Sequence, residues 1–435
     1  MKKGVVVLLI VIALIVLITP GIIGRLAEES IDQNLELAVS ENEDVVVSSL
    51  GFVRGWFTSE GQHRIELRDR SLLPGPDDAD DQRRYAEAII VTTRIDHGLI
   101  PVTSMAREEG SLAPGLGSAV STLGVEISDG TLVDIPGKVY SEVGLTGELQ
   151  SNFLLEADTV DAEGRLLDWG DVDLLVTSNP VTGAMSVKGK IGASSVSSPQ
   201  ETLRIGPVEI DGQQQPGPFG YPLGSIDLSI DSVLIQSTFD DFTVGPMTLE
   251  SNLDAAGDRV DADIRFQVAY VRSDIGDAAI TWHARMVGAD GNALGALVRT
   301  HREMSDPDRA WSALKESDAA LEALLASGME LHFDRFDLVV PQGTVSSTLH
   351  LAVLATSPDE MNWAEVILAL DGTLEFSVSQ GIVDFITGQF PEFGTAVALG
   401  YLRKSGDLYE TLVEIRSGVL TINGAPMQIP LDAFQ

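Results

Sequence analysis

Short apolar runs separated by turn residues make up most of the chain. Between residues 125 and 196, runs of Val, Ile and Leu alternate with Gly, Asp and Asn, and the same pattern resumes from Ser225 onward. Runs of this length, bounded by turn residues, are typical of β-strands joined by tight turns. The Asn423-Gly424 dipeptide is a strong hairpin signal. The pattern predicts a mainly β protein with a few helices, built on a large antiparallel and strongly curved sheet system.

Two stretches have helical periodicity instead. The first can be capped by Asp306 and ended by Gly328, with an apolar stripe between them. The second covers residues 382–402 and is interrupted near Pro391, because proline breaks the hydrogen-bond pattern of a helix. We expect a helical region in each stretch and strands on either side.

Two other segments resemble loops. Residues 110–124 are rich in Gly, Ala, Ser and Pro, which predicts a loop or a poorly formed element. Residues 211–218 read Asp-Gly-Gln-Gln-Gln-Pro-Gly-Pro, which predicts a linker or a long turn. A division near residues 211–220 would separate two halves of one sheet system rather than two independent domains.

The N-terminal segment predicts membrane attachment. Residues 4–24 are mostly apolar, and this length spans a hydrocarbon core of about 30 Å as a helix. A cleaved signal peptide is the alternative, but it would have a shorter apolar core and a site of small residues. Lys2 and Lys3 favour a cytoplasmic N-terminus. We expect a transmembrane anchor at 1–24, a helical stalk at 25–44 and a β-rich domain at 45–435 outside the cytoplasm.

The charge balance narrows the choice of partners. The chain has 65 acidic residues against 28 basic ones, a net charge of −37. A nucleic-acid partner is not expected, because phosphate binding depends on patches of Lys and Arg. An acidic surface stays soluble by self-repulsion and suits a saline environment, whereas the functional alternative is a cation-binding surface. The chain has no Cys, which excludes disulfides and thiolate metal sites.

Several short motifs resemble those of the YdgA-like family, bacterial proteins with a domain of unknown function. The anchor begins Met-Lys-Lys, an aromatic-x-Arg-Gly-Trp-Phe-x-Ser run follows it, a His-Gly pair ends a predicted strand, and the tail contains the Asn-Gly hairpin. The resemblance implies a protein of the bacterial inner membrane with its bulk in the periplasm. The family has no established enzymatic activity that the resemblance could imply for this chain. The motif residues are Phe52, Arg54, Gly55, Trp56, Phe57, Ser59, His97, Gly98, Asn423 and Gly424.

The Arg-Gly-Trp-Phe run has two interpretations. As a strand kinked by Gly55, it would direct one of its aromatic side chains into the core, and Trp56 has the larger apolar surface. Alternatively, the aromatic residues could lie at a membrane interface, which Trp favours. We expect Trp56 to be buried.

No pattern of catalytic or metal-binding residues is evident. The six His form no H-E-x-x-H or similar spacing, and no nucleophile elbow or Walker loop occurs. His332 and His350 belong to different predicted strands and could meet only through the fold. We therefore predict no catalytic residues, no cofactor, no metal site and no enzymatic activity.

Two functions fit these observations. The first is binding or handling of lipid or another apolar ligand, since a sheet tethered beside a bilayer can present an apolar groove. The second is a structural or interaction protein whose sheet pairs with a second copy, as a homodimer, or with another envelope protein. The first predicts an open apolar groove in the monomer, whereas the second predicts that side chains or a partner fill that face.

Overall fold

The structure is a computed structural model that describes residues 45–67, 86–97, 115–127, 132–162, 165–198, 200–237, 241–274, 276–304, 310–355, 363–390 and 393–427. The predicted anchor at 1–24, the predicted stalk at 25–44 and Gly98 lie outside these residues. No helix within the described ranges is long and apolar enough to cross a membrane. The prediction of a mainly β chain with a few helices is confirmed.

The chain forms two compact units. Unit 1 contains Met1–Ala162 and Leu167–Ala193, and unit 2 contains Glu163–Leu166 and Ser194–Gln435. Residues 211–216, which we predicted to belong to a linker or long turn, instead lie in a strand that pairs along its whole length. Their Gly and Gln residues have weak strand propensity, but pairing with a neighbouring strand overrides it.

Unit 1 is an antiparallel sheet in which each strand pairs with the next in the order β1-β2-β3-β4-β5-β6-β9-β10. Its strands are β1 (Val45–Arg54), β2 (Thr58–Leu67), β3 (Ala86–His97), β4 (Gly115–Ile127), β5 (Leu132–Gly144), β6 (Leu149–Leu155), β7 (Asp158–Ala162), β9 (Val172–Asn179) and β10 (Ala184–Ile191); β8 (Arg165–Trp169) crosses the division between the units.

Strand β4 corrects our expectation of a loop at 110–124. It pairs with β3 on one side and β5 on the other. Its small residues are needed for this close packing: a Cβ on Gly115 would lie 2.7 Å from the Val143 carbonyl oxygen, and one on Gly124 would lie 2.9 Å from the Leu132 side chain. The glycines that suggested a loop therefore allow two strands to approach.

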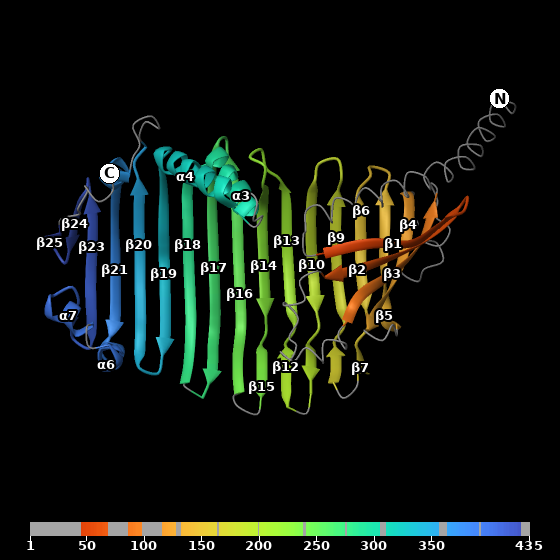
Figure 1. Cartoon of the computed structure of the whole chain (residues 1–435), viewed down its shortest axis with the longest axis horizontal. Helices are drawn as coiled ribbons and strands as arrows, with labels where there is room; N and C mark the ends of the chain where they lie inside the picture. Colours follow the sequence, from red (N-terminus) through yellow and green to blue (C-terminus); the bar gives the residue numbers. More distant parts are fainter. Residues whose placement is uncertain are drawn as a thin grey trace, which may run out of the picture. The chain divides into compact units, whose positions relative to one another are not determined.

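Unit 2 is a second antiparallel arrangement, with β13, β14, β16, β17, β18, β19, β20, β21, β23, β24 and β25 as successive neighbours (Figure 1). Its strands are β11 (Ser194–Ser197), β12 (Glu201–Ile205), β13 (Val208–Pro216), β14 (Pro222–Ile230), β15 (Val233–Ser237), β16 (Asp241–Ala256), β17 (Arg259–Ser273), β18 (Gly276–Asp290), β19 (Met329–Val340), β20 (Gly343–Val353), β21 (Leu370–Ser379), β22 (Arg403–Ser405), β23 (Leu408–Arg416), β24 (Val419–Ile422) and β25 (Ala425–Met427).

Our prediction of a strongly curved sheet is wrong. Strong bending requires repeated bulges or glycine kinks that turn the strands. Among the ladders described in unit 2, the register shifts only in β17–β18, β18–β19 and β19–β20. The ladders of β13–β14, β14–β16, β20–β21 and β21–β23 each keep one uninterrupted register. The strands therefore lie side by side as an open sheet (Figure 1).

The helices of unit 2 are α3 (Gly291–Met304), α4 (Ala310–Ala326), α5 (Trp363–Ala369), α6 (Gln380–Gln389) and α7 (Phe393–Ala398). The predicted helix end at Gly328 is confirmed by its φ of 79°, a backbone conformation that glycine adopts readily. The predicted region at 382–402 is confirmed as α6 and α7, with the interruption between them. Sequence reasoning missed α3 and α5. Asp290 starts α3, because its Oδ1 accepts a hydrogen bond of 2.9 Å from the Ala293 N–H.

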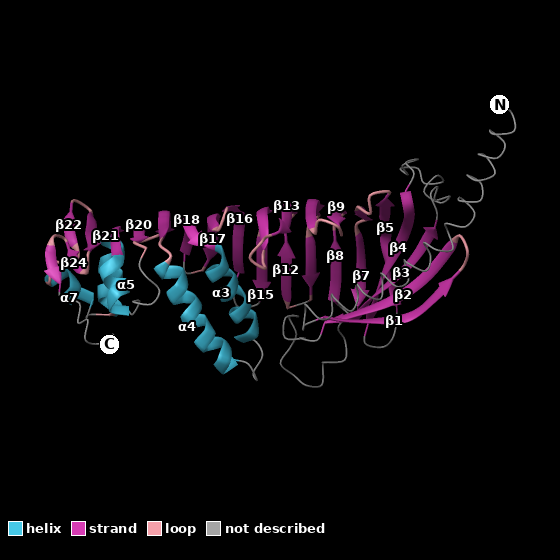
Figure 2. Cartoon of the chain, turned by 90° about the horizontal axis from the view of Figure 1, so that it is seen from above, coloured by secondary structure: helices cyan, strands magenta, loops and turns pink. Residues whose placement is uncertain are grey.

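The buried core of unit 2 lies where helices contact the sheet. One cluster joins α3 and α4 to the sheet through Ala293, Leu324 and Met329, and another joins α6 to it through Val378 and Ile382. Figure 2 shows α3, α4, α5 and α7 on one side of this sheet. The two clusters contact different ends of its strands.

Candidate functional site

The Arg-Gly-Trp-Phe run forms the turn between β1 and β2. The Gly55 N–H donates a hydrogen bond of 2.8 Å to the Thr58 carbonyl oxygen, which closes the turn. A Cβ on Gly55 would lie 2.6 Å from that same oxygen, so only glycine fits here. The motif glycine is therefore required by a tight turn and not by a kink within a strand.

Two other motif residues meet beside this turn. The Ser59 Oγ lies 2.7 Å from the His97 Nε2, and both side chains are buried. The His97 N–H also donates to the Phe57 carbonyl oxygen at 2.7 Å, so the end of β3 is held to the turn. Burial lowers the pKa of His97 and keeps its ring neutral. Because Ser59 is only 2% exposed, this pair favours a role in joining strands.

Our expectation that Trp56 is buried is wrong. Trp56 is 58% exposed and Phe57 is 48% exposed. Both lie in the turn that connects β1 and β2, where their side chains project past the ends of the two strands. Arg54 is also exposed, whereas Phe52 is half-buried. Leu50 and Val53 are exposed as well, so the β1–β2 hairpin presents several apolar side chains to solvent.

The Asn423-Gly424 pair connects β24 and β25, and the predicted hairpin turn is confirmed. Both residues have positive φ, 52° and 78°, as a two-residue hairpin turn requires. Asn423 also holds the neighbouring chain: its Nδ2 donates to the carbonyl oxygens of Gly400 and Tyr401 at 2.9 and 3.0 Å, and its Oδ1 accepts from the Leu412 N–H at 2.9 Å. This residue stabilises the end of unit 2.

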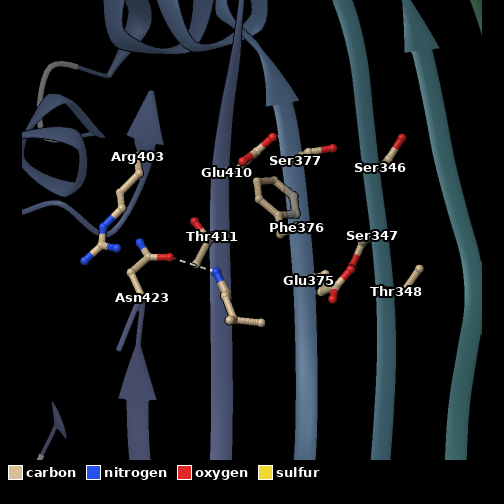
Figure 3. A pocket seen from close by; sticks show the side chains of 11 residues that line it. Ser346, Ser347, Thr348, Glu375, Phe376, Ser377, Arg403, Glu410, Thr411 and Asn423 are labelled. Atoms are coloured by element: carbon tan, nitrogen blue, oxygen red, sulfur yellow. Dashed lines mark hydrogen bonds between the residues drawn. The ribbon is translucent and has the colours of Figure 1, made fainter. Parts of the chain in front are cut away.

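A groove of about 460 Å³ lies over the strands beside Asn423 (Figure 3). Most of its lining residues carry hydroxyl, amide or charged side chains, and Phe376 and Leu412 add apolar surface. The lining residues are Ser346, Ser347, Thr348, Glu375, Phe376, Ser377, Arg403, Glu410, Thr411, Leu412 and Asn423.

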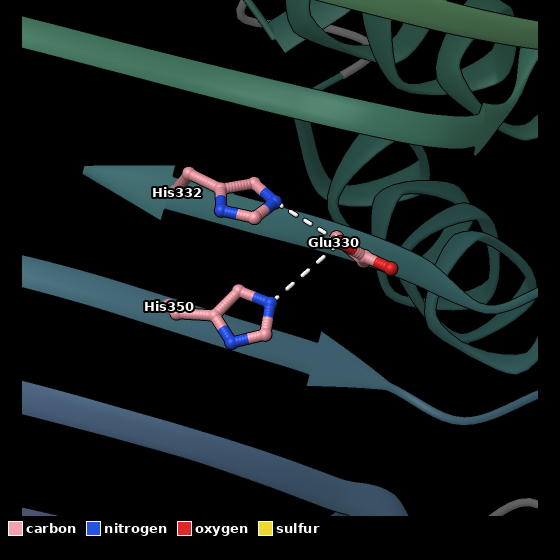
Figure 4. Close-up of side chains that lie close together, drawn as sticks. All are labelled: Glu330, His332 and His350. Atoms are coloured by element: carbon pink, nitrogen blue, oxygen red, sulfur yellow. Dashed lines mark hydrogen bonds and ion pairs between the residues drawn. The ribbon is translucent and has the colours of Figure 1, made fainter. Parts of the chain in front are cut away.

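The fold brings His332 and His350 together with Glu330. His332 on β19 pairs directly with His350 on β20, and their ring centroids are 4.6 Å apart. The Glu330 Oε2 lies 3.0 Å from the His332 Nε2 and 3.6 Å from the His350 Nε2 (Figure 4). The ligand atoms of all three residues lie within 4.8 Å of one another. These three residues could hold a metal ion, and our prediction of no metal site did not anticipate that the fold brings them together.

Charged side chains continue across the same face of the sheet. His283 lies between Asp263 and Asp334, at 3.2 and 3.4 Å. The Arg285 Nη2 donates to the Asp334 Oδ1 at 2.8 Å. This hydrogen bond lowers the pKa of Asp334 and raises that of Arg285, so both stay charged. We call this side of unit 2 the polar face.

The opposite side of unit 2 has an apolar character. Two adjacent rows of residues cross the strands from β13 to β23, and none of their positions holds a charged residue. We call their large side chains the central apolar rows. They are Ile210, Ile226, Leu228, Leu249, Ile264, Phe266, Trp282, Phe333, Phe336, Leu349, Leu374, Phe376 and Val413.

The central apolar rows are only half covered. Twelve of these thirteen side chains are partly buried, Ile226 is 38% exposed, and none is fully buried. A second layer packed over them would bury them as completely as the residues under the helices. The Trp282 and Phe333 rings stack on each other with centroids 6.3 Å apart, so the rows form one continuous surface.

Comparison with known proteins gives a family. Residues 1–430 match the model described as "Bacterial protein of unknown function (DUF945)". The chain belongs to this family. No curated protein and no solved structure matches it. The family is bacterial and of unknown function, as the motif resemblance implied, and it assigns no activity.

In this DUF945 protein, five of the ten predicted motif residues stabilise turns and strand ends. The turn residues Gly55, Asn423 and Gly424, together with Ser59 and His97, occupy such positions. Sequence reasoning missed Glu330. The available signal was its spacing of two from His332 on a predicted strand, which places both side chains on one face.

Proposed function

We propose that the apolar face of unit 2 binds the acyl chains of lipid, and that residues 1–24 anchor the protein in the bacterial inner membrane with residues 45–435 in the periplasm. The apolar length of residues 4–24 and the N-terminal Lys2 and Lys3 support the anchor. The resemblance to YdgA-like proteins and the bacterial family support the location.

The observation that carries the lipid proposal is the half-covered state of the central apolar rows. Half-exposed aromatic and aliphatic side chains without a charged neighbour in their rows match an acyl chain, which is apolar and long and offers no hydrogen bond. Each methylene removed from water contributes on the order of 0.8 kcal/mol, so a chain lying across several strands would bind firmly.

A matched pair of variants on β17 tests this proposal. Phe266 lies in the central apolar rows, and its neighbour Gln267 is exposed on the polar face. The full chain is purified in mild detergent, and co-purifying lipid is quantified by mass spectrometry together with binding of a fluorescent fatty acid. We expect Phe266→Glu to lower the amount of co-purifying lipid and the affinity for the fatty acid by at least about tenfold, because burying a carboxylate against an acyl chain is unfavourable. Gln267→Glu should leave both quantities unchanged.

The oligomeric state distinguishes the alternative, in which a second copy covers the face. If the wild-type chain is a dimer that carries no lipid, and Phe266→Glu is a monomer, the structural and interaction function is favoured instead. Circular dichroism of both variants confirms that the sheet is retained, so a change in binding is not a loss of folding.

A further inference from the structure

We propose that Glu330, His332 and His350 form a binding site for a divalent transition-metal ion of the kind that imidazole prefers, with Zn²⁺ as the representative ion. The site lies on the polar face of unit 2, on the opposite side of β19 and β20 from Leu331 and Leu349. It is therefore separate from the proposed lipid surface, and either proposal can fail without the other.

The geometry of the cluster fits three of the four positions of a tetrahedral coordination sphere. Zn²⁺ takes imidazole nitrogens and carboxylate oxygens at about 2.0–2.2 Å, which places tetrahedral ligand atoms about 3.3 Å apart. The two Glu330 to imidazole separations are 3.0 and 3.6 Å. Both imidazoles direct Nε2 toward the same carboxylate oxygen (Figure 4). Small side-chain rotations would place one ion among all three groups.

The ligand set selects the class of ion. Two of the three ligands are imidazole nitrogens, which suit zinc and its first-row neighbours, whereas calcium and magnesium require oxygen ligands. Three protein ligands leave a coordination position for water, as in zinc sites that remain open. Glu330 and His350 are about half exposed and His332 is 17% exposed on its side chain, so an ion can enter from solvent.

A β-bulge creates this arrangement. Near the turn, Phe336 pairs with Ser347, whereas beyond the bulge Phe333 pairs with Leu349, so β19 contains one extra residue. Without it, His332 would pair with Leu351 and the two imidazoles would lie on opposite faces. The surrounding charge does not oppose a cation, because the adjacent Arg285 is matched by Asp334 and the chain carries a net charge of −37.

Calorimetric titration with Zn²⁺ tests the site. The full chain is purified without a polyhistidine tag in a non-coordinating buffer that contains excess Mg²⁺, which saturates unspecific acidic sites. We expect one Zn²⁺ per chain, with at least about tenfold weaker binding in His332→Ala, in His350→Ala and in Glu330→Gln. Substitution by Co²⁺ should give a visible absorption band that the His350→Ala variant loses.

Two control variants make the result specific. His301→Ala removes an exposed imidazole on α3, and His283→Ala removes the neighbouring imidazole on the polar face, so both should bind Zn²⁺ as the wild type does. The proposal is overturned if the wild type does not bind Zn²⁺ in excess Mg²⁺, or if the His332 and His350 variants bind it unchanged. It is also overturned if the His301 variant loses binding equally. Unchanged thermal unfolding of the variants shows that they remain folded.

Discussion

At the scale of single residues, the most informative side chains are aromatic. Trp56 and Phe219 are both large apolar residues beside a glycine, yet one is 58% exposed and the other 7% exposed. Trp56 lies in a turn that extends beyond its two strands. Phe219 stacks on Tyr221 with ring centroids 5.9 Å apart, in a cluster with Leu223 and Val260. Position in the fold, rather than residue type, sets their contribution to stability.

This contrast predicts opposite effects of the same substitution. Trp56→Ala should change the free energy of unfolding by less than about 1 kcal/mol, because an exposed side chain loses little contact area. Phe219→Ala should lower it by about 3–5 kcal/mol, because it leaves a cavity in a packed cluster. Thermal unfolding of both variants, followed by circular dichroism, measures the difference. A large destabilisation by Trp56→Ala would restore the core role that we first expected.

At the scale of elements, one arginine connects three of them. Arg259, the first residue of β17, donates hydrogen bonds through its guanidinium to the carbonyl oxygens of Gly288, Ser327 and Gly328, at 2.8, 2.9 and 3.0 Å. Ser327 and Gly328 follow the end of α4, where carbonyl groups have no partner within the helix. The positive charge also complements the negative end of the helix dipole.

Removal of this guanidinium should loosen the contact between α4 and the sheet. We expect Arg259→Met, which keeps most of the apolar stem, to lower the free energy of unfolding by at least about 2 kcal/mol, because three partly buried carbonyl groups lose a charged donor. Arg272→Met is the matched control, since Arg272 lies at the other end of β17 and its pairing with Asp277 is exposed, at 3.8 Å. Equal melting temperatures for the two variants would contradict this role of Arg259.

At the scale of the whole molecule, the proposed location depends on the N-terminal residues and the charge. Lys2 and Lys3 precede the apolar run, and the chain that follows carries all of the 65 acidic residues. Short positive segments tend to remain in the cytoplasm, and long segments are translocated largely regardless of their charge. The proposed location of the two units in the periplasm rests on this rule and not on their fold.

Fusions to the C-terminus test the proposed orientation. A reporter that is active only outside the cytoplasm, joined after Gln435, should be active, and one that requires the cytoplasm should be inactive. The mature protein should also retain its N-terminus in mass spectrometry. The reverse pattern of reporter activity would contradict the orientation, and removal of residues 1 to about 25 would support a cleaved signal peptide instead.

Local chemistry explains what could be predicted from the sequence. The mainly β composition, the helix end at Gly328 and the hairpin at Asn423-Gly424 follow from the backbone preferences of a few neighbouring residues. Each of these three expectations is confirmed. The loop predicted at 110–124 and the linker predicted at 211–218 relied on the same preferences, but β4 and β13 form there because pairing with adjacent strands compensates for weak propensity.

The sequence by itself therefore determined the class of the fold, the helix end at Gly328, the hairpin turn at Asn423-Gly424 and the net charge of −37. Only the tertiary structure decided which side chains meet. His332 and His350 are separated by a turn, and a one-residue bulge in β19 places them on the same face. The side chains of a strand alternate with a period of two, so one extra residue reverses every facing relationship beyond it. No local pattern reveals that shift, because register depends on contacts between strands and not on the strand alone.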